Sequence, residues 1–161
     1  MNDITLTPIG AVESPLATQT DLGWGSVISR VVLLPEYRAG LQGLDAFSHV
    51  IVVIHLHRAR FDPGRDLVRR PRGLAEMPEV GIFAQRARDR PNAIGVTAVE
   101  IVEVRADSVV VRGLDAIDGT PVVDLKPYVP QYDRIESPTT PGWMNRLMEG
   151  YFRDEEGTDE R

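Results

Sequence analysis

The sequence predicts a mainly β protein: a single closed, mostly antiparallel β-barrel with short helices and a C-terminal helical tail. Apolar and polar residues alternate with a period of two in a series of short segments, as they do in half-buried strands. The 14 glycines and 12 prolines punctuate these segments, and helical character is confined to two short stretches. Many short strands separated by turns favour a barrel over alternating β and α units, because closure also removes exposed strand edges.

The expected strands follow one another along the first 125 residues. They are residues 3–12, 26–34, 48–57, 80–84, 95–104, 108–114 and 121–125, and 48–57 is the most apolar. Pro15 ends the first strand, Gly25 precedes the second, and Ala106-Asp107 is a tight hairpin turn between 95–104 and 108–114. Helices are expected over 36–41 and 142–152. Residues 1–135 would therefore form the barrel domain, and residues 136–161 a short helix and acidic tail.

Length and composition limit the function classes. A chain of 161 residues with 42% hydrophobic and 26% charged residues is long enough to bury a core as one domain. It has no cysteine, which excludes disulfides, thiolate zinc sites, iron–sulfur clusters and cysteine nucleophiles. The longest apolar run, residues 50–54, is too short for a bilayer, and the acidic N-terminus does not resemble a secretory signal. We expect a cytoplasmic protein without membrane contact.

Arginine is concentrated in the middle of an acidic chain. The net charge is −6, from 18 basic and 24 acidic residues. Residues 58–90 contain nine arginines and five acids, a net charge of +4, so the remainder carries −10. A GC-rich genome would explain a general arginine excess, but the clustering favours a small anion or an RNA backbone as the partner. Within this stretch, residues 62–78 have no periodicity and are expected to form a long, functional loop.

Three histidines share one predicted strand. His49, His55 and His57 all have odd numbers, so the alternation of a strand would point them to the same face. His-x-His on a strand is the spacing of a cupin-type metal site, but no glutamate follows within five residues, and we predict no metal. Packed histidines are one alternative and the polar wall of a small-molecule pocket is another. His57, at the strand end, is the best candidate for a pocket.

Residues 81–95 combine turn-forming and basic residues. Pro91 fixes the backbone here, and Arg86, Arg88 and Arg90 alternate just before it. A stiff turn that presents guanidinium groups suits an anionic ligand, although a solvated arginine loop has the same pattern.

Residues 113–128 are rich in carboxylates. Asp115, Asp118 and Asp124 lie within ten residues, with Lys126 and Tyr128 close by. They could receive ribose hydroxyls or a cationic group, or simply cap turns. By contrast, the chain has no Gly-x-Gly-x-x-Gly after a strand, no P-loop and no Gly-x-Ser-x-Gly elbow. These absences argue against a Rossmann enzyme, a P-loop enzyme and an α/β-hydrolase.

Five blocks together resemble the TrmO family, also called the YaeB or VirR-like family, over residues 7–130. They are Pro8-Ile9-Gly10, residues 43–49 (GLDAFSH), Gly81-Ile82-Phe83-Ala84 with Arg86, Arg90-Pro91-Asn92 with Ile94-Gly95, and residues 113–128. The resemblance implies a small β-barrel that binds S-adenosylmethionine, usually as a homodimer with cofactor sites near the subunit interface. It also implies N6-methylation of threonylcarbamoyladenosine beside the anticodon of tRNA. A barrel that binds S-adenosylmethionine or another adenosine compound without turnover is the alternative.

The resemblance also implies site residues. Cofactor contacts fall on His57, Arg58, Arg86, Val96, Arg112, Gly113, Leu114 and Asp115, and on Asp21, Leu22 and Gly23 near the N-terminus. Residues expected to meet the substrate are Arg88, Arg90, Asn92, Lys126 and Tyr128. Asp115 and Asp118 are the catalytic candidates, since either carboxylate could orient the acceptor or take its proton.

The sequence departs from the family pattern in two places. The family's usual Arg-Pro-Asn-Pro-Ile-Gly has Ala93 in place of its second proline, which is expected to loosen one turn. About thirty residues follow the barrel where the longer bacterial members carry a C-terminal domain.

Overall fold

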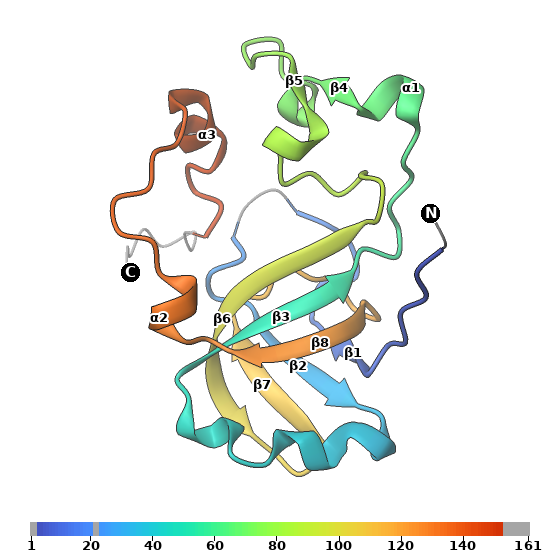
Figure 1. The fold of residues 1–161 in the computed structure, drawn as a ribbon, viewed down its shortest axis with the longest axis vertical. Coiled ribbons are helices and arrows are strands. Elements are labelled where there is room, and N and C mark those ends of the chain that lie inside the picture. The colour runs from blue at the N-terminus through green and yellow to red at the C-terminus, as the bar shows by residue number, and fades with distance from the viewer. Residues whose placement is uncertain (1–2, 21–22, 153–161) are drawn as a thin grey trace.

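A six-stranded antiparallel barrel forms the body of the protein in a computed structural model that describes residues 3–20 and 23–152 (Figure 1). Its strands pair in the order β1-β2-β7-β6-β3-β8, and β8 pairs back with β1 to close the ring. The strands are β1 (Gly10–Glu13), β2 (Ile28–Leu33), β3 (His49–His55), β6 (Ile94–Val104), β7 (Ser108–Arg112) and β8 (Pro121–Pro127). The predicted mainly β class with antiparallel pairing is confirmed.

The alternating pattern of β3 explains its central place. Val50, Val52 and Ile54 are buried, whereas His49 and His55 at the two ends are exposed. β3 pairs with β6 along its whole length and with β8 on its other edge. The hairpin predicted at Ala106-Asp107 joins β6 to β7, where the Arg105 N–H donates to the Ser108 carbonyl at 2.8 Å.

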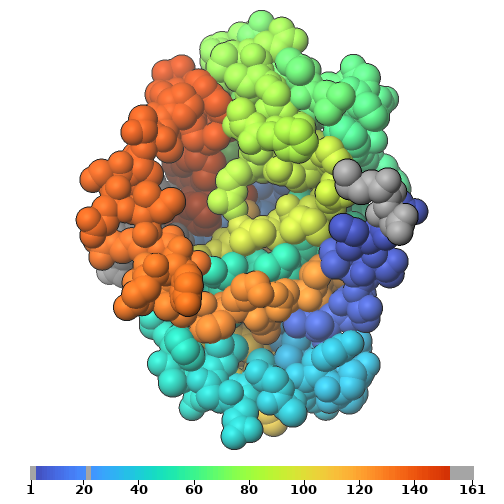
Figure 2. Space-filling model, viewed as in Figure 1, coloured from blue at the N-terminus to red at the C-terminus, as the bar shows by residue number. Residues whose placement is uncertain are grey.

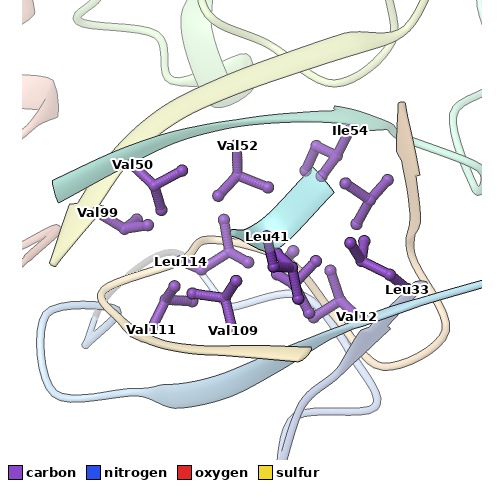
Figure 3. Close-up of a cluster of buried hydrophobic side chains, with 13 residues drawn as sticks. Val12, Leu33, Leu41, Val50, Val52, Ile54, Val99, Val109, Val111 and Leu114 are labelled. Atoms are coloured by element: carbon purple, nitrogen blue, oxygen red, sulfur yellow. The ribbon is translucent and has the colours of Figure 1, made fainter. Parts of the chain in front are cut away.

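An aliphatic core fills the barrel. In Figure 3, Val50 and Val52 of β3 point across the interior toward Val109 and Val111 of β7. Leu41 reaches this cluster from the 3-10 helix η1 (Pro35–Leu41), which with η2 (Leu44–Ala46) lies across one end of the barrel (Figure 1). The cluster comprises Val12, Val31, Leu33, Leu41, Val50, Val52, Ile54, Val99, Val109, Val111, Leu114, Ala116 and Val122.

Two predicted strands are wrong in extent or partner. Residues 3–9 are not in a strand, and the apolar side chains of Ile4 and Leu6 lie in solvent with 87% and 54% of their surface exposed. Of the predicted strand 80–84, only β5 (Val80–Gly81) is extended, and the 3-10 helix η4 (Ile82–Ala84) follows it. β5 pairs with β4 (Val68–Arg69) outside the barrel, because the chain folds back on itself there.

The segment expected to be a long loop is instead a structured insert, which we define as residues 62–85. It contains α1 (Pro63–Asp66), β4, the 3-10 helix η3 (Pro71–Gly73), β5 and η4. Asp66 is fully buried and accepts hydrogen bonds from Arg65, Arg69 and the backbone N–H of Asp62. Gln85 closes the far end of the insert by donating to the carbonyls of Arg69 and Val80 at 3.0 Å each. Ion pairing therefore orders a segment that has no hydrophobic period.

The buried Asp66 predicts a pH-dependent stability of the insert. The hydrogen bond from Arg65, together with that from the Asp62 N–H, lowers the pKa of Asp66 to about 2. Since this folded-state pKa lies below the ordinary value, the ionised group stabilises fully above about pH 5, and this contribution is lost as the pH falls toward 2. Asp66→Asn should therefore lower the urea midpoint strongly at pH 7 and much less at pH 3.

The control for this prediction is Glu103→Gln. Arg105 also lowers the pKa of Glu103, but this pair lies on the surface, where ion pairs contribute little. Its urea midpoint should change little at either pH. An equal loss of stability for Asp66→Asn at both pH values would contradict the assigned role of the ionised carboxylate.

The C-terminal part of the chain returns to the barrel from outside. After α2 (Pro130–Asp133), the short helix α3 (Gly142–Leu147) covers only half of the helix expected over 142–152, and residues 148–152 form turns. Figure 2 shows this segment, in orange and red, beside the green insert, with a hollow between them. Among the described residues, no helix combines the length and the apolar character that a membrane crossing needs.

Candidate functional site

A pocket of about 120 Å³ brings together four of the residues singled out in the sequence: His57, Arg58, Arg88 and Asp115. His57 and Arg58 follow the end of β3, Asp115 follows β7, and Arg88 belongs to the basic stretch before Pro91. Thr18, Gln19 and Trp24, between β1 and β2, also line the pocket. Parts of the chain that are distant in sequence therefore meet here.

The sequence analysis missed more than half of the pocket lining. The additional lining residues are Thr18, Gln19, Trp24, Leu56, Ala116, Ile117 and Thr120. Of these residues, only Trp24 could have been suspected from the sequence, because a large aromatic side chain in a segment without periodicity is expected to pack against another part of the chain. It is 1% exposed in the structure. The others are apolar or uncharged polar residues, and their patterns in the sequence carry no chemical signature.

Two hydroxyl groups hold the Asp115 carboxylate. The Thr97 hydroxyl donates to Oδ1 at 2.5 Å, and the Tyr151 hydroxyl donates to Oδ2 at 3.0 Å. An ionised carboxylate accepts about four hydrogen bonds, so each oxygen keeps acceptor capacity. Asp115 can therefore accept hydrogen bonds from hydroxyl or amino groups of a ligand in the pocket.

His57 is a neutral group beside cationic neighbours. Burial lowers the pKa of His57 from its ordinary value of 6.5, and the charges of Arg58 and His55 lower it further. The imidazole is therefore uncharged at neutral pH and can accept a proton or a hydrogen bond. The Arg58 guanidinium donates to the carbonyl of Ala17 at 2.9 Å, which fastens the segment after β1 to the end of β3.

Arg86 and Val96 lie together next to this site. The Arg86 guanidinium donates to the Val96 carbonyl, which links the stretch before Pro91 to strand β6. Val96 keeps 44% of its surface exposed, and Phe83, three positions before Arg86, is 80% exposed. Both apolar side chains are therefore uncovered in the described part of the chain.

Other expected cofactor residues have structural partners instead. Arg112 pairs with Glu100 at 3.1 Å on the outside of the barrel, and Leu114 is fully buried in the core. Gly113 has φ +85°, a conformation that glycine adopts without strain at the end of β7. Gly23, with φ +81°, precedes Trp24, whereas Asp21 and Leu22 lie outside the described residues.

The two catalytic candidates are separated. Asp118 does not line the pocket with Asp115; its Oδ1 accepts from the Ser14 N–H at 3.1 Å. It borders a shallow groove on the outside of the barrel together with Glu13 and Arg30. Asp118 therefore links the turn that it begins with Gly119 to the segment that follows β1.

The expected substrate residues are spread over several surfaces. Arg88 donates to Gln19 at 2.9 Å and pairs with Asp89, while Arg90 donates to the Gln85 carbonyl at 3.2 Å. Asn92 is exposed at the turn that follows. On β8 and beyond it, Lys126 pairs with Asp124 at 2.7 Å, and the Tyr128 ring lies 6.2 Å from that of His49. This last group lies among barrel strands and does not line the pocket.

The three histidines do not form one cluster. β3 ends at His55, so His57 leaves the strand alternation and turns to the pocket while His49 and His55 stay exposed. His49 Nδ1 lies 2.8 Å from the Ser48 hydroxyl. Within residues 3–20 and 23–152, no three histidine or acidic side chains are placed to hold a metal ion.

The pocket combines three kinds of surface. Asp115 offers acceptors, Arg58 and Arg88 offer guanidinium groups, and Trp24, Leu56 and Ile117 offer apolar contacts. This set suits a ligand that has hydroxyl or amino donors, an anionic end and a flat apolar ring.

Several proteins of known name are similar to this chain. An S-adenosyl-L-methionine-binding protein of Archaeoglobus fulgidus is 39% identical over 134 residues, which cover 81% of this chain and 93% of that protein. The tRNA (adenine(37)-N6)-methyltransferase of Escherichia coli is 45% identical over 94 residues, 56% of this chain and 40% of that enzyme. The crystal structure of TrmO from Pseudomonas aeruginosa matches with a TM-score of 0.72 and 29% identity over 89% of this chain and 62% of that one.

The chain thus spans less than two thirds of the solved TrmO structure and less than half of the Escherichia coli enzyme. Residues 16–134 match the family model described as the tRNA-methyltransferase O N-terminal domain. This range contains the strands β2 to β8 and every described residue that lines the pocket. The chain therefore belongs to the family of the tRNA-methyltransferase O N-terminal domain.

Proposed function

We propose that this chain is an S-adenosylmethionine-dependent methyltransferase that modifies N6 of an adenine derivative next to the anticodon of tRNA. The pocket that joins Asp115, His57 and Arg58 within the family-matched residues is the observation that carries the proposal. The names of the Archaeoglobus and Escherichia coli relatives supply the cofactor and the acceptor.

The residues present fit one end of S-adenosylmethionine. The carboxylate of Asp115 suits its hydroxyl or amino donors, Arg58 and Arg88 suit its carboxylate, and Trp24 suits its adenine ring. A volume of about 120 Å³ is small beside the roughly 300–1,000 Å³ of ligand pockets, so the remainder of the molecule would extend beyond these walls.

Within this proposal each residue has a physical role. S-adenosylmethionine supplies a methyl group on a sulfonium, and the protein aligns the acceptor nitrogen with it. Asp115 orients the ligand through its free acceptor positions, and Arg58 holds Ala17, which precedes the lining residues Thr18 and Gln19, in place. His57, neutral at pH 7 because burial lowers its pKa, is the group that would accept the proton of the acceptor nitrogen.

The insert would contribute the contacts to RNA. Arg60 precedes the insert and is exposed, Arg70 within the insert is exposed but donates to the Met77 carbonyl, and Arg72 lies over the ring of Tyr151 at 6.0 Å. Arg65 and Arg69 are instead committed to Asp66, so only part of the arginine cluster is available for phosphates. Binding of tRNA should accordingly weaken with salt, with a slope set by those few contacts. A tRNA substrate would place the protein in the cytoplasm.

We also propose a homodimer whose second copy completes the cofactor site. The apolar side chains of Phe83 and Val96 are exposed, and Arg86 donates to the Val96 carbonyl, so a monomer leaves both side chains uncovered. Such a partner would supply walls that the small pocket lacks. Sedimentation equilibrium decides this point: a monomer at micromolar concentration would contradict it, and so would a dimer that Phe83→Glu does not weaken.

Two measurements test the proposed function. Calorimetric titration of the cofactor-free protein with S-adenosylmethionine should give a dissociation constant in the micromolar range. Labelled S-adenosylmethionine should then transfer its methyl group to tRNA that carries threonylcarbamoyladenosine and not to tRNA that lacks it. Binding without transfer to any tRNA would favour the non-catalytic binding module, and absence of binding at millimolar ligand would overturn both.

A further inference from the structure

One residue outside the family-matched segment reaches the candidate site. Tyr151 lies near the end of the described chain, 36 positions after Asp115, yet its hydroxyl donates to Asp115 Oδ2 at 3.0 Å. The family match ends at residue 134, so nothing in that match assigns a role to this tyrosine.

Three further contacts fix Tyr151 in this place. Its carbonyl accepts the Trp24 N–H at 3.1 Å, and Trp24 itself lines the pocket. Its ring packs edge-on against Phe152 with centroids 4.9 Å apart, and the Arg72 guanidinium of the insert lies over the ring, 6.0 Å from its centroid. The residue therefore joins the 24–27 turn, the insert and the segment after β7.

The backbone at Gly25 lies very close to the backbone of Phe152. A Cβ atom on Gly25 would lie 1.9 Å from the Phe152 carbonyl oxygen, so the glycine allows the C-terminal segment to approach the 24–27 turn. Such a close approach orders the hydroxyl of Tyr151 without the need for a long helix. Two donors, from Thr97 and Tyr151, then hold the two oxygens of Asp115 from outside the pocket.

We propose that Tyr151 is a positioning residue, which acts through Asp115 to hold its carboxylate toward the pocket as an acceptor for hydroxyl or amino groups of an adenosine-type cofactor. The inference rests on the proposed function for the identity of the ligand. Since Thr97 and Tyr151 each use one acceptor position, the remaining positions of the carboxylate have a fixed direction. Burial and the neighbouring Asp115 raise the pKa of the Tyr151 phenol, which keeps its proton and remains a donor.

The first test is a double-mutant cycle with S-adenosylmethionine as the probe. Tyr151→Phe keeps the ring against Phe152 and removes only the hydroxyl, so the dissociation constant should rise roughly five- to tenfold. In the Asp115→Ala background the same substitution should change it by less than about twofold, because the group through which it acts is gone. A merely structural role would give the same factor in both backgrounds and would overturn the inference.

Matched variants distinguish an effect of the Tyr151 hydroxyl on binding from a general effect of the substitution on folding. Tyr132→Phe removes a hydroxyl from a side chain that is 88% exposed, and its dissociation constant should equal that of the unaltered protein. Thr97→Val should weaken binding by a factor similar to that of Tyr151→Phe, while Thr97→Ser, which keeps the donor, should restore it. A Tyr151→Phe protein that binds as tightly as the unaltered one would overturn the inference.

A second readout needs no ligand. In tyrosine-labelled protein, the NMR signal of Tyr151 is identified as the one that is missing from the Tyr151→Phe variant. This signal should show a protonated phenol at about pH 10, where an ordinary tyrosine is half ionised. Asp115→Ala should shift this ionisation to lower pH. If the Tyr151 phenol ionises at the pH of an ordinary tyrosine, and Asp115→Ala does not change that pH, the link between the two residues would be overturned. If the link is present but the unaltered protein binds no S-adenosylmethionine, the proposed function fails, and the ligand named in the inference fails with it.

Discussion

Replacing Asp115 by alanine is expected to weaken S-adenosylmethionine binding by roughly 10- to 100-fold, the cost of losing hydrogen bonds to a charged group. The substitution removes the pocket acceptor and leaves the hydroxyls of Thr97 and Tyr151 without their partner. Calorimetric titration of the purified variant measures the effect. Thermal unfolding of the same sample should show that the barrel still folds, because its aliphatic core does not include Asp115.

The comparison variant is Asp118→Ala. Both aspartates belong to the carboxylate-rich stretch and both were catalytic candidates, but Asp118 accepts the Ser14 N–H and does not line the pocket. Its loss should reduce stability by about 1 kcal/mol and leave cofactor affinity unchanged. Equal affinity losses for the two variants would show that the pocket does not distinguish them and would contradict the site assignment.

The sequence could identify one half of the pocket and not the other. His57 and Asp115 could be predicted from the sequence, because they are polar side chains at the ends of apolar strands and the family resemblance covers them. Trp24 and Tyr151 lie in segments without periodicity, and what brings them to Asp115 is a backbone contact between residues 127 positions apart, Trp24 and Tyr151. No local pattern encodes a contact of that separation.

The fold shows the same division. Alternation predicted β2, β3, β6, β7 and β8, because each has one face in the aliphatic core. It failed at residues 3–9, where Ile4 and Leu6 alternate correctly but meet no sheet in the described chain. It also missed the insert, whose order comes from the buried Asp66 and its arginines rather than from apolar spacing.

The arginine cluster has a different meaning once these contacts are known. Arg65 and Arg69 neutralise Asp66, Arg86 holds Val96, and Arg88 joins Gln19 to Asp89. Each of these arginines already has a partner within the protein, so its guanidinium group is not fully available to bind RNA. A charge count alone therefore overstates the basic surface available to a phosphate backbone.

Ala93→Pro is expected to destabilise the protein by about 2–3 kcal/mol, although it restores the family's usual sequence at this turn. Ala93 has φ +47°, and its N–H donates to the Arg90 carbonyl at 3.2 Å. Proline fixes φ near −65° and has no N–H, so it fits neither feature. The turn is therefore not simply a looser form of the family motif, as the resemblance suggested, but one with a different backbone.

The effect should reach the pocket, since the Ala93 carbonyl accepts the N–H of Leu56, the residue before His57, at 2.8 Å. Urea unfolding measures the loss, and the matched variant is Ala93→Gly. Glycine takes positive φ without strain, so this variant should gain about 0.5–1 kcal/mol after the entropy of the unfolded chain is included. A proline variant as stable as the unaltered protein, with no gain for glycine, would mean that Ala93 adopts the negative φ that the family sequence requires.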